Sequence, residues 1–265
     1  MGPYAKWVSE YLDISKCAFD LLAGATAAPL SKTTALAYTI HALSMHAEAT
    51  SITARLALTY SLGLPAFALS RVRIEQTIVS SYLVHAPSND GIDPYLAHHP
   101  IQVYEVLRKG ARYFELDVDL EAPLRSAQEA AASLPGAAPH VGDFRRTWTA
   151  LKVPQMAERR DQYAGDTLVP WKLSDEYWRL YPLASLAVHG AAETNFWLGE
   201  LHSPELGSSE RYPYLLPGRA RAVSSAIARL DILQCAEAVT LLLPDSANLV
   251  SPLVERCERE MRRDA

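Results

Sequence analysis

The run PAFALSRVRIEQTIVSSYLV, residues 65–84, is the strongest indication of the fold of this chain. Its residues are apolar on almost every side of the helix that their spacing predicts, which is typical of a helix at the centre of a bundle. Pro65 suits the first position of a helix, and Pro87 follows soon after the end of the run. We therefore expect an all-α protein organised around a buried central helix near residues 65–84.

Helical signals continue on both sides of this run, whereas strand signals are scarce. The chain has no period-two run of β-branched residues and no Asn-Gly or Asp-Gly hairpin turn between two such runs. Apolar spacing and boundary residues predict a bundle of about eight or nine helices in a single domain over residues 1–265. The expected helices cover residues 4–22, 32–62, 65–84, 101–114, 120–134, 144–163, 175–199, 219–243 and 249–263. The expected loops cover residues 87–100, 135–143 (a mobile lid) and 203–217.

Composition limits the classes of function. The hydrophobic fraction of 49% and the charged fraction of 21% are those of an ordinary globular protein. The net charge of −5 argues against a large nucleic-acid footprint, although a local basic groove is compatible with it. The three cysteines form no Cys-x-x-Cys pair, and no apolar run approaches the length of about 18 residues needed to cross a bilayer. A cytoplasmic protein with no membrane partner is expected.

The central helix carries two groups of polar residues. At about 100° per residue, Arg71 and Glu75 share one face, one turn apart, and Tyr82 flanks them. We expect this face to be buried and the opposite polar strip to face solvent. That strip comprises Ser70, Arg73, Thr77 and Ser80. Arg71 and Glu75 are interpreted either as an ion pair that fixes helix packing, or as part of a pocket in which Arg71 binds an anion.

A second candidate group lies in YWRLYPLASLAVHGAAETNFW, residues 177–197. Tyr181, Ser185 and His189 follow one another at four-residue steps, and Glu193 extends the row. A histidine with such neighbours within one turn is a candidate acid or base, and a satisfied core histidine is the alternative. No Gly-x-Ser-x-Gly elbow surrounds Ser185, which argues against a serine nucleophile.

The helix before the central one places His41 and Glu48 on one face. A carboxylate-bridged metal bundle needs Glu-x-x-His on two helices, and the chain contains no such motif. Gly-x-Gly-x-x-Gly and P-loop patterns are absent as well. We therefore expect neither a metal nor an organic cofactor, and interpret His41 and Glu48 as ligand-binding residues.

One resemblance connects these features. The run SITARLALTYSLGLPAFALSRVRIEQTIVSSYL, residues 51–83, resembles the core of a bacterial family of unknown function, an all-helical group likened to HEPN domains. Residues of two later segments extend the resemblance over residues 35–200, with the C-terminal helices in 219–263 packing on this core. They are Trp148, Met156, Ala157 and Tyr163, then Tyr181, Ser185, Val188, His189 and Gly190. The resemblance implies that Arg71 and Glu75 approach the Tyr181, Ser185 and His189 face.

Three functions follow as hypotheses. The first is a cofactor-independent enzyme or binding protein that holds a small anionic ligand in a buried polar pocket between helices 65–84 and 175–199. Its catalytic residues would be His189, Glu75, Tyr181 and Ser185, and its ligand-binding residues Arg71, Tyr82, Glu193, His41 and Glu48. The second is a HEPN-like RNA nuclease or defence toxin, although the Arg-to-His spacing of those nucleases is missing. The third is a non-catalytic interaction protein, with homodimerisation as its expected mode.

Overall fold

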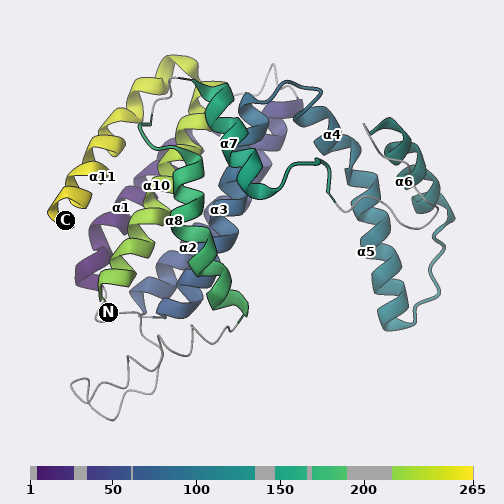
Figure 1. Cartoon of the computed structure of the whole chain (residues 1–265), viewed down its shortest axis with the longest axis horizontal. Helices are drawn as coiled ribbons and strands as arrows, with labels where there is room; N and C mark the ends of the chain where they lie inside the picture. The colour runs from purple at the N-terminus through teal and green to yellow at the C-terminus, as the bar shows by residue number, and fades with distance from the viewer. Residues whose placement is uncertain are drawn as a thin grey trace, which may run out of the picture. The chain divides into compact units, whose positions relative to one another are not determined.

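A computed structural model describes residues 5–26, 35–60, 62–134, 147–165, 169–189 and 217–264 (Figure 1). Its α-helices are α1 (Ala5–Thr26), α2 (Ala35–Thr59), α3 (Gly63–His85), α4 (Ile92–Ala97), α5 (His99–Phe114), α6 (Glu121–Ser133), α7 (Val153–Ala164), α8 (Leu173–His189), α10 (Pro217–Leu242) and α11 (Ser251–Asp264), and a 3₁₀ helix covers Pro244–Leu249. No strand occurs in these ranges, and the all-α prediction is confirmed. None of the helices within them is long and apolar enough to cross a membrane.

The chain divides into two compact units, and each is described by itself. The first comprises Met1–His85 with Val153–Ala265, and the second comprises Ala86–Lys152. The second unit therefore interrupts the sequence of the first between α3 and α7. The single domain expected over residues 1–265 stays a prediction, because compactness alone does not tell whether the two units unfold together.

Helix α10 lies inside the first unit. It packs against α1, α2, α3 and α8, and Figure 1 shows it between α1 and α8. Its side chains are buried around the whole circumference, as Leu230, Ile232 and Leu233 on successive sides show. The C-terminal helices in 219–263 are expected to pack on the core within residues 35–200, and in the structure α10 packs against α2, α3 and α8 of that range as well as against α1. Helix α3 shares this interior and contacts α2, α7, α8 and α10.

The polar strip of α3 faces inward, so the expected solvent exposure of that strip is wrong. All four of its residues are completely buried: Ser70, Arg73, Thr77 and Ser80. The physical reason is Asp231 on α10, which is itself buried and supplies a charged partner for the strip. Arg71 and Glu75, expected to be buried, retain 22% and 39% of their side-chain exposure.

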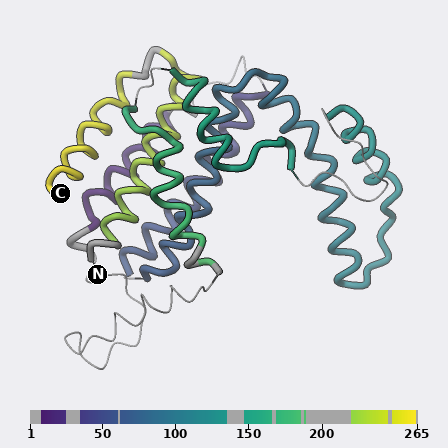
Figure 2. The backbone as a smooth tube through the Cα atoms, in the orientation of Figure 1, coloured from purple at the N-terminus to yellow at the C-terminus, as the bar shows by residue number. Residues whose placement is uncertain are grey.

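The second unit is a small helical hairpin. Helix α6 runs back alongside α5 (Figure 2), and the two enclose a core of five buried residues. They are Ile101, Tyr104, Ala127, Ala131 and Leu134. The short α4 falls within the loop expected at residues 87–100, because Asp93 and Pro94 suit the first turn of a helix as well as a turn. The helix expected from residue 144 begins at Val153, and the lid expected at residues 135–143 lies outside the described residues.

The three cysteines predict a simple chemical test of this packing. Burial raises the pKa of both Cys235 and Cys257 to about 12, whereas Cys17 is partly exposed. A raised pKa leaves a thiol protonated at pH 8, and the protonated form is a poor nucleophile. We expect one thiol per chain to react with a disulfide reagent at pH 8 in the native protein, and three in urea. Rapid labelling of all three native thiols would contradict this packing of α10 and α11.

Candidate functional site

The interior of the first unit contains a closed network of charged and hydroxyl groups. The Arg73 Nε–H lies 2.8 Å from Asp231 Oδ1 and 2.9 Å from Ser51 Oγ, so it donates to both. The Ser51 hydroxyl donates in turn to Asp231 Oδ1 at 2.7 Å, and the Ser15 hydroxyl donates to the other carboxylate oxygen. Helices α1, α2, α3 and α10 each contribute a residue, so the network joins four elements.

The Arg73 guanidinium is the buried positive charge of this network, and burial changes its pKa. Burial lowers the pKa of the Arg73 guanidinium, and the charge and hydrogen bond of Asp231 oppose that effect. Its Nη2 donates to the Leu230 carbonyl at 3.3 Å, and its Nη1 donates to the Thr77 hydroxyl. The guanidinium also lies 5.9 Å from the centre of the Phe19 ring. Because Arg73 and Asp231 pair with each other and neither side chain has any exposure, this network is structural rather than a ligand site.

A second network extends from α10 towards the surface. Glu237 accepts hydrogen bonds from the Arg160 Nε–H at 2.9 Å and from its Nη2, both at Oε1. The other carboxylate oxygen contacts the His85 Nε2 at the end of α3. Glu237 and Arg160 are buried, whereas His85 retains 20% of its side-chain exposure. Glu237 therefore links a buried arginine with a partly exposed imidazole.

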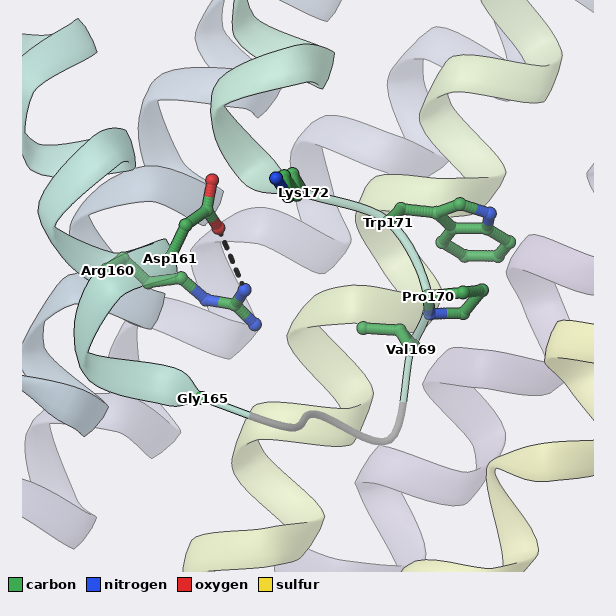
Figure 3. Close-up of a pocket in the computed structure, with 7 residues that line it drawn as sticks. All are labelled: Arg160, Asp161, Gly165, Val169, Pro170, Trp171 and Lys172. Atoms are coloured by element: carbon green, nitrogen blue, oxygen red, sulfur yellow. Dashed lines mark hydrogen bonds and ion pairs between the residues drawn. The ribbon is translucent and has the colours of Figure 1, made fainter.

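Arg160 also lines a pocket between the end of α7 and the beginning of α8 (Figure 3). The pocket has a volume of about 270 Å³ and is lined by Arg160, Asp161, Gly165, Val169, Pro170, Trp171 and Lys172. In Figure 3, Arg160 and Asp161 project from α7 and Val169 points towards them, whereas Pro170 and Trp171 project from the other side of their segment. The interior of the pocket is therefore mainly polar.

Asp161 holds two parts of the pocket in place. One of its oxygens accepts from Arg160 Nη1 at 3.0 Å and from the Leu173 backbone N–H at 3.0 Å. The other accepts from the Ser174 backbone N–H at 2.9 Å. The carboxylate thus caps α8, whose first N–H groups have no partner within the helix. The same contacts fix the orientation of the Arg160 guanidinium beside the pocket.

The pocket has unused hydrogen-bond donors. A guanidinium carries five N–H groups, and Arg160 directs three of them at Glu237 and Asp161. Two further N–H groups, one on each Nη, have no acceptor among the residues that the structure describes. Lys172 lines the same pocket, is exposed, and forms no ion pair with any residue that the structure describes. The site therefore offers one oriented cation, Arg160, and one exposed cation, Lys172.

The predicted group on α3 and α8 forms a separate cluster. Arg71 Nε lies 3.5 Å from Glu75 Oε1, and the Arg71 guanidinium lies 5.2 Å from the centre of the Tyr181 ring. Tyr181 stacks on Tyr177 with 4.7 Å between ring centres. Burial and a hydrogen bond to Glu75 raise the pKa of the Tyr181 hydroxyl, and Arg71 opposes this. The structure thus brings Arg71 and Glu75 to Tyr181, and their catalytic or binding roles stay predictions.

The other predicted site residues do not gather into one place. Tyr82 is buried beside the Tyr163 ring, at 6.3 Å between centres, and Ser185 is half-buried on α8. His41 and Glu48 are half-buried on α2, and the described contacts include none between them and the α3–α8 cluster. The side chain of His189 and the whole of Glu193 lie outside the described residues.

The sequence did not point to the three residues that Glu237 joins: His85, Arg160 and Glu237 itself. A signal was present in the helix at residues 219–243, where charged and amide residues recur at Asp231, Gln234 and Glu237 in an otherwise apolar run. Their three-residue spacing places them along one side of a helix. Polar residues so arranged in an apolar helix indicate partners on neighbouring helices.

The fold and these networks define an all-helical protein with ionic groups in its interior. The chain belongs to a family of unknown function (DUF5677), whose model matches residues 39–198. The matched span is close to the expected 35–200 and contains Arg160, Asp161 and Lys172. Searches of curated proteins and of solved structures gave no match. The likeness to HEPN domains stays a prediction.

Proposed function

We propose that the protein binds a small anionic molecule in the pocket between α7 and α8. The observation that carries the proposal is that Arg160 and Lys172 line one concave surface, where two Arg160 N–H groups and the Lys172 ammonium have no partner among the described residues. Arg160 would act as a fork for two oxygens of a phosphate or carboxylate, and Lys172 would add a compact charge. The proposal keeps the ligand class expected from the sequence and moves its site away from the α3–α8 cluster.

Size and charge support a small ligand. Pockets for drug-sized molecules occupy about 300–1,000 Å³, and this one, at about 270 Å³, suits a smaller molecule. Asp161 and Glu237 already neutralise much of the Arg160 charge. Lys172 is therefore the principal source of attraction for an incoming anion, and Arg160 provides its orientation.

An enzymatic role is a second candidate, and the Glu237 bridge favours it. Glu237 orients the His85 imidazole with one oxygen and Arg160 with the other. A carboxylate-oriented histidine is a common acid–base group because its proton exchanges near neutral pH. Under this proposal Arg160 holds the anionic substrate, and His85, which is not among the residues that line the pocket, exchanges a proton with a part of the substrate that extends beyond it. His85→Gln, tested on any ligand found for the pocket, should then abolish turnover while binding survives.

The direct test measures thermal unfolding and calorimetric binding with inorganic phosphate, pyrophosphate, small carboxylates and short RNAs. A ligand present at 100 times its Kd stabilises the native state by about 2.7 kcal/mol. We expect a small anion to raise the Tm of the wild type. Lys172→Ala should weaken its binding roughly 10- to 100-fold, because a charge-assisted hydrogen bond is worth about 1.5–3 kcal/mol.

Two control variants separate local from general charge effects. Lys172→Arg keeps the cation and should retain most of the affinity for the anion. Lys109→Ala removes an exposed lysine on α5 and should leave that affinity unchanged. The proposal is wrong if no small anion shifts the Tm, or if Lys172→Ala binds as tightly as the wild type. A shift with RNA alone would favour the nuclease alternative instead.

A further inference from the structure

The exposed side of α2 has no aspartate, glutamate, lysine or arginine. Beyond its first residue, the exposed positions of this helix are Tyr38, Met45, His46, Ala49, Ile52, Thr53 and Leu56. The four large apolar side chains among them, at positions 38, 45, 52 and 56, expose 65%, 54%, 40% and 53% of their surface. A surface helix normally carries charged residues on the side away from the core. The composition of this side is instead that of an interaction surface.

The apolar residues on this side follow the spacing of a coiled coil. Six of them succeed one another at steps of four, three, four, three and four: Tyr38, Ala42, Met45, Ala49, Ile52 and Leu56. We call these six residues the α2 seam. They lie on the far side of the helix from Ala47, Ser51 and Ala54, which are buried. Alternating steps of three and four form a heptad repeat, in which each side chain fits between those of a facing helix.

Large and small side chains alternate along the seam, which suits a second copy of α2 that runs in the opposite direction. When Ala49 lies beside Ile52 of the second copy, Met45 lies beside Leu56 of the same copy. Each alanine then meets a larger side chain, and the two helices can approach closely without leaving a void. The seam is therefore complementary to itself in an antiparallel arrangement.

The two charged residues of α2 flank the seam on one side. Glu48 and Arg55 each stand one position before a seam residue and lie two turns apart. Both are half-buried, and neither forms an ion pair with any residue that the structure describes. Arg55 makes one hydrogen bond, from its Nη1 to the Ser15 hydroxyl at 3.1 Å. A twofold axis keeps this flank on the same side of both helices, so in the arrangement above Glu48 lies beside Arg55 of the second copy.

These charges select one register among those that the seam allows. An antiparallel shift by one heptad, in either direction, places Glu48 beside its own copy or Arg55 beside its own copy. Parallel pairing places Glu48 beside Thr53 of the second copy and Arg55 beside Tyr60, so no opposite charges meet. Only the register that pairs Ala49 with Ile52 joins the two signs, and it does so twice because of the twofold symmetry.

We propose that the α2 seam is the contact of a twofold homodimer, in which α2 of one copy packs antiparallel on α2 of the other. Met45, Ile52 and Leu56 supply the buried apolar surface, and the small alanines allow the helices to approach. The two pairs of Glu48 with Arg55 fix the direction and register more than the affinity. One helix from each copy makes a small interface, so dimerisation depends on protein concentration in the micromolar range.

A lipid surface is the competing partner for an apolar helix face. Helices that lie in a membrane interface carry several lysine or arginine residues beside the apolar face, and these attract anionic headgroups. Helix α2 has a single arginine, Arg55, and no lysine. Glu48 on the same flank would be repelled by anionic lipids. The charges of α2 therefore favour a second copy of the chain.

The first test measures the mass of the full chain, 29.2 kDa as a monomer, by sedimentation equilibrium between about 1 and 100 µM. The wild type should dimerise, and Met45→Glu with Leu56→Glu should raise the dimer Kd at least about tenfold, because both glutamates would be buried. The matched control is Val106→Glu with Tyr113→Glu, which changes two apolar side chains of α5 that are 70% and 80% exposed. It should dimerise like the wild type.

Cysteine cross-linking tests the direction of the helices and decides if the glutamate variants do not fold. Met45→Cys and Leu56→Cys are made separately in a Cys17→Ser background, whose two remaining native cysteines are buried. When the two variants are mixed and oxidised, they should form a disulfide-linked dimer, because these positions face each other in the proposed register. Neither variant should link to itself, because antiparallel packing separates its two cysteines by about 16 Å along the helix axis.

Three results would overturn the proposal. They are a wild type that stays monomeric at about 100 µM, a dimer that the two α2 glutamates leave intact, and cysteine variants that link to themselves but not to each other. Wild-type binding to phosphatidylglycerol vesicles that the two α2 glutamates abolish would assign the seam to a lipid surface instead.

Discussion

Replacing Asp231 with alanine is expected to lower the free energy of unfolding by about 3–5 kcal/mol, since it leaves a buried charge without its partner. Arg73 has no exposed surface, and its Nε–H and the Ser51 hydroxyl both donate to Asp231. In the variant the Arg73 guanidinium either stays charged in an apolar surrounding or admits water into the interior. Both outcomes are costly, because domain stability totals only about 5–15 kcal/mol.

Urea unfolding followed by circular dichroism measures this effect. The matched control is Asp20→Ala, which removes an equivalent carboxylate from an exposed pair with Lys16 on α1 and should leave the midpoint unchanged. If Asp231→Ala does not fold, the double variant Arg73→Met, Asp231→Leu keeps the test decisive. It removes both charges and should recover at least half of the lost stability. Equal stabilities for Asp231→Ala and the wild type would show that Arg73 has another partner.

The helical fold could be predicted from the sequence because apolar periodicity is a local property. The helix at residues 65–84 is present as α3, and the boundaries of α5 and α6 fall close to those expected. The short α4 was missed, since Gly91 and Pro94 belong equally to turns and to the beginning of a helix. These differences concern where helices begin and end, which the local sequence specifies least well.

The direction in which a polar strip faces could not be predicted in the same way. Arg73, Thr77 and Ser80 have the pattern of a solvent-exposed strip, and their burial depends on Asp231, which is 158 residues from Arg73 in the sequence. Periodicity shows that polar residues share a side of a helix, but not whether water or another polar strip meets them. The α7–α8 pocket was missed for the same reason, because Glu237 fixes Arg160 from a distant helix.

Replacing Arg229 with lysine keeps the charge and is nevertheless expected to cost about 2–4 kcal/mol of unfolding free energy, as a broken buried network does. The Arg229 Nε–H and Nη2–H donate to the two oxygens of Glu176 at 3.0 Å and 2.8 Å, a bidentate pair between α10 and α8. Its Nη1 donates to the Ser225 hydroxyl at 2.7 Å and contacts the Met261 sulfur of α11 at 3.0 Å. An ammonium cannot reproduce this planar fork, so at least two of the four contacts are lost.

Arg179 provides the control within the same network, because it binds the same carboxylate from the surface. Its Nη1 lies 3.2 Å from Glu176 Oε1, and its side chain is 62% exposed. Arg179→Lys should change the free energy of unfolding by less than about 0.5 kcal/mol, since water replaces the lost hydrogen bond. A large difference between the two variants would show that burial and geometry, rather than charge, determine how strongly Glu176 joins α8 to α10. Equal effects would mean that the bidentate geometry contributes nothing, and that α8 is held to α10 by apolar packing alone.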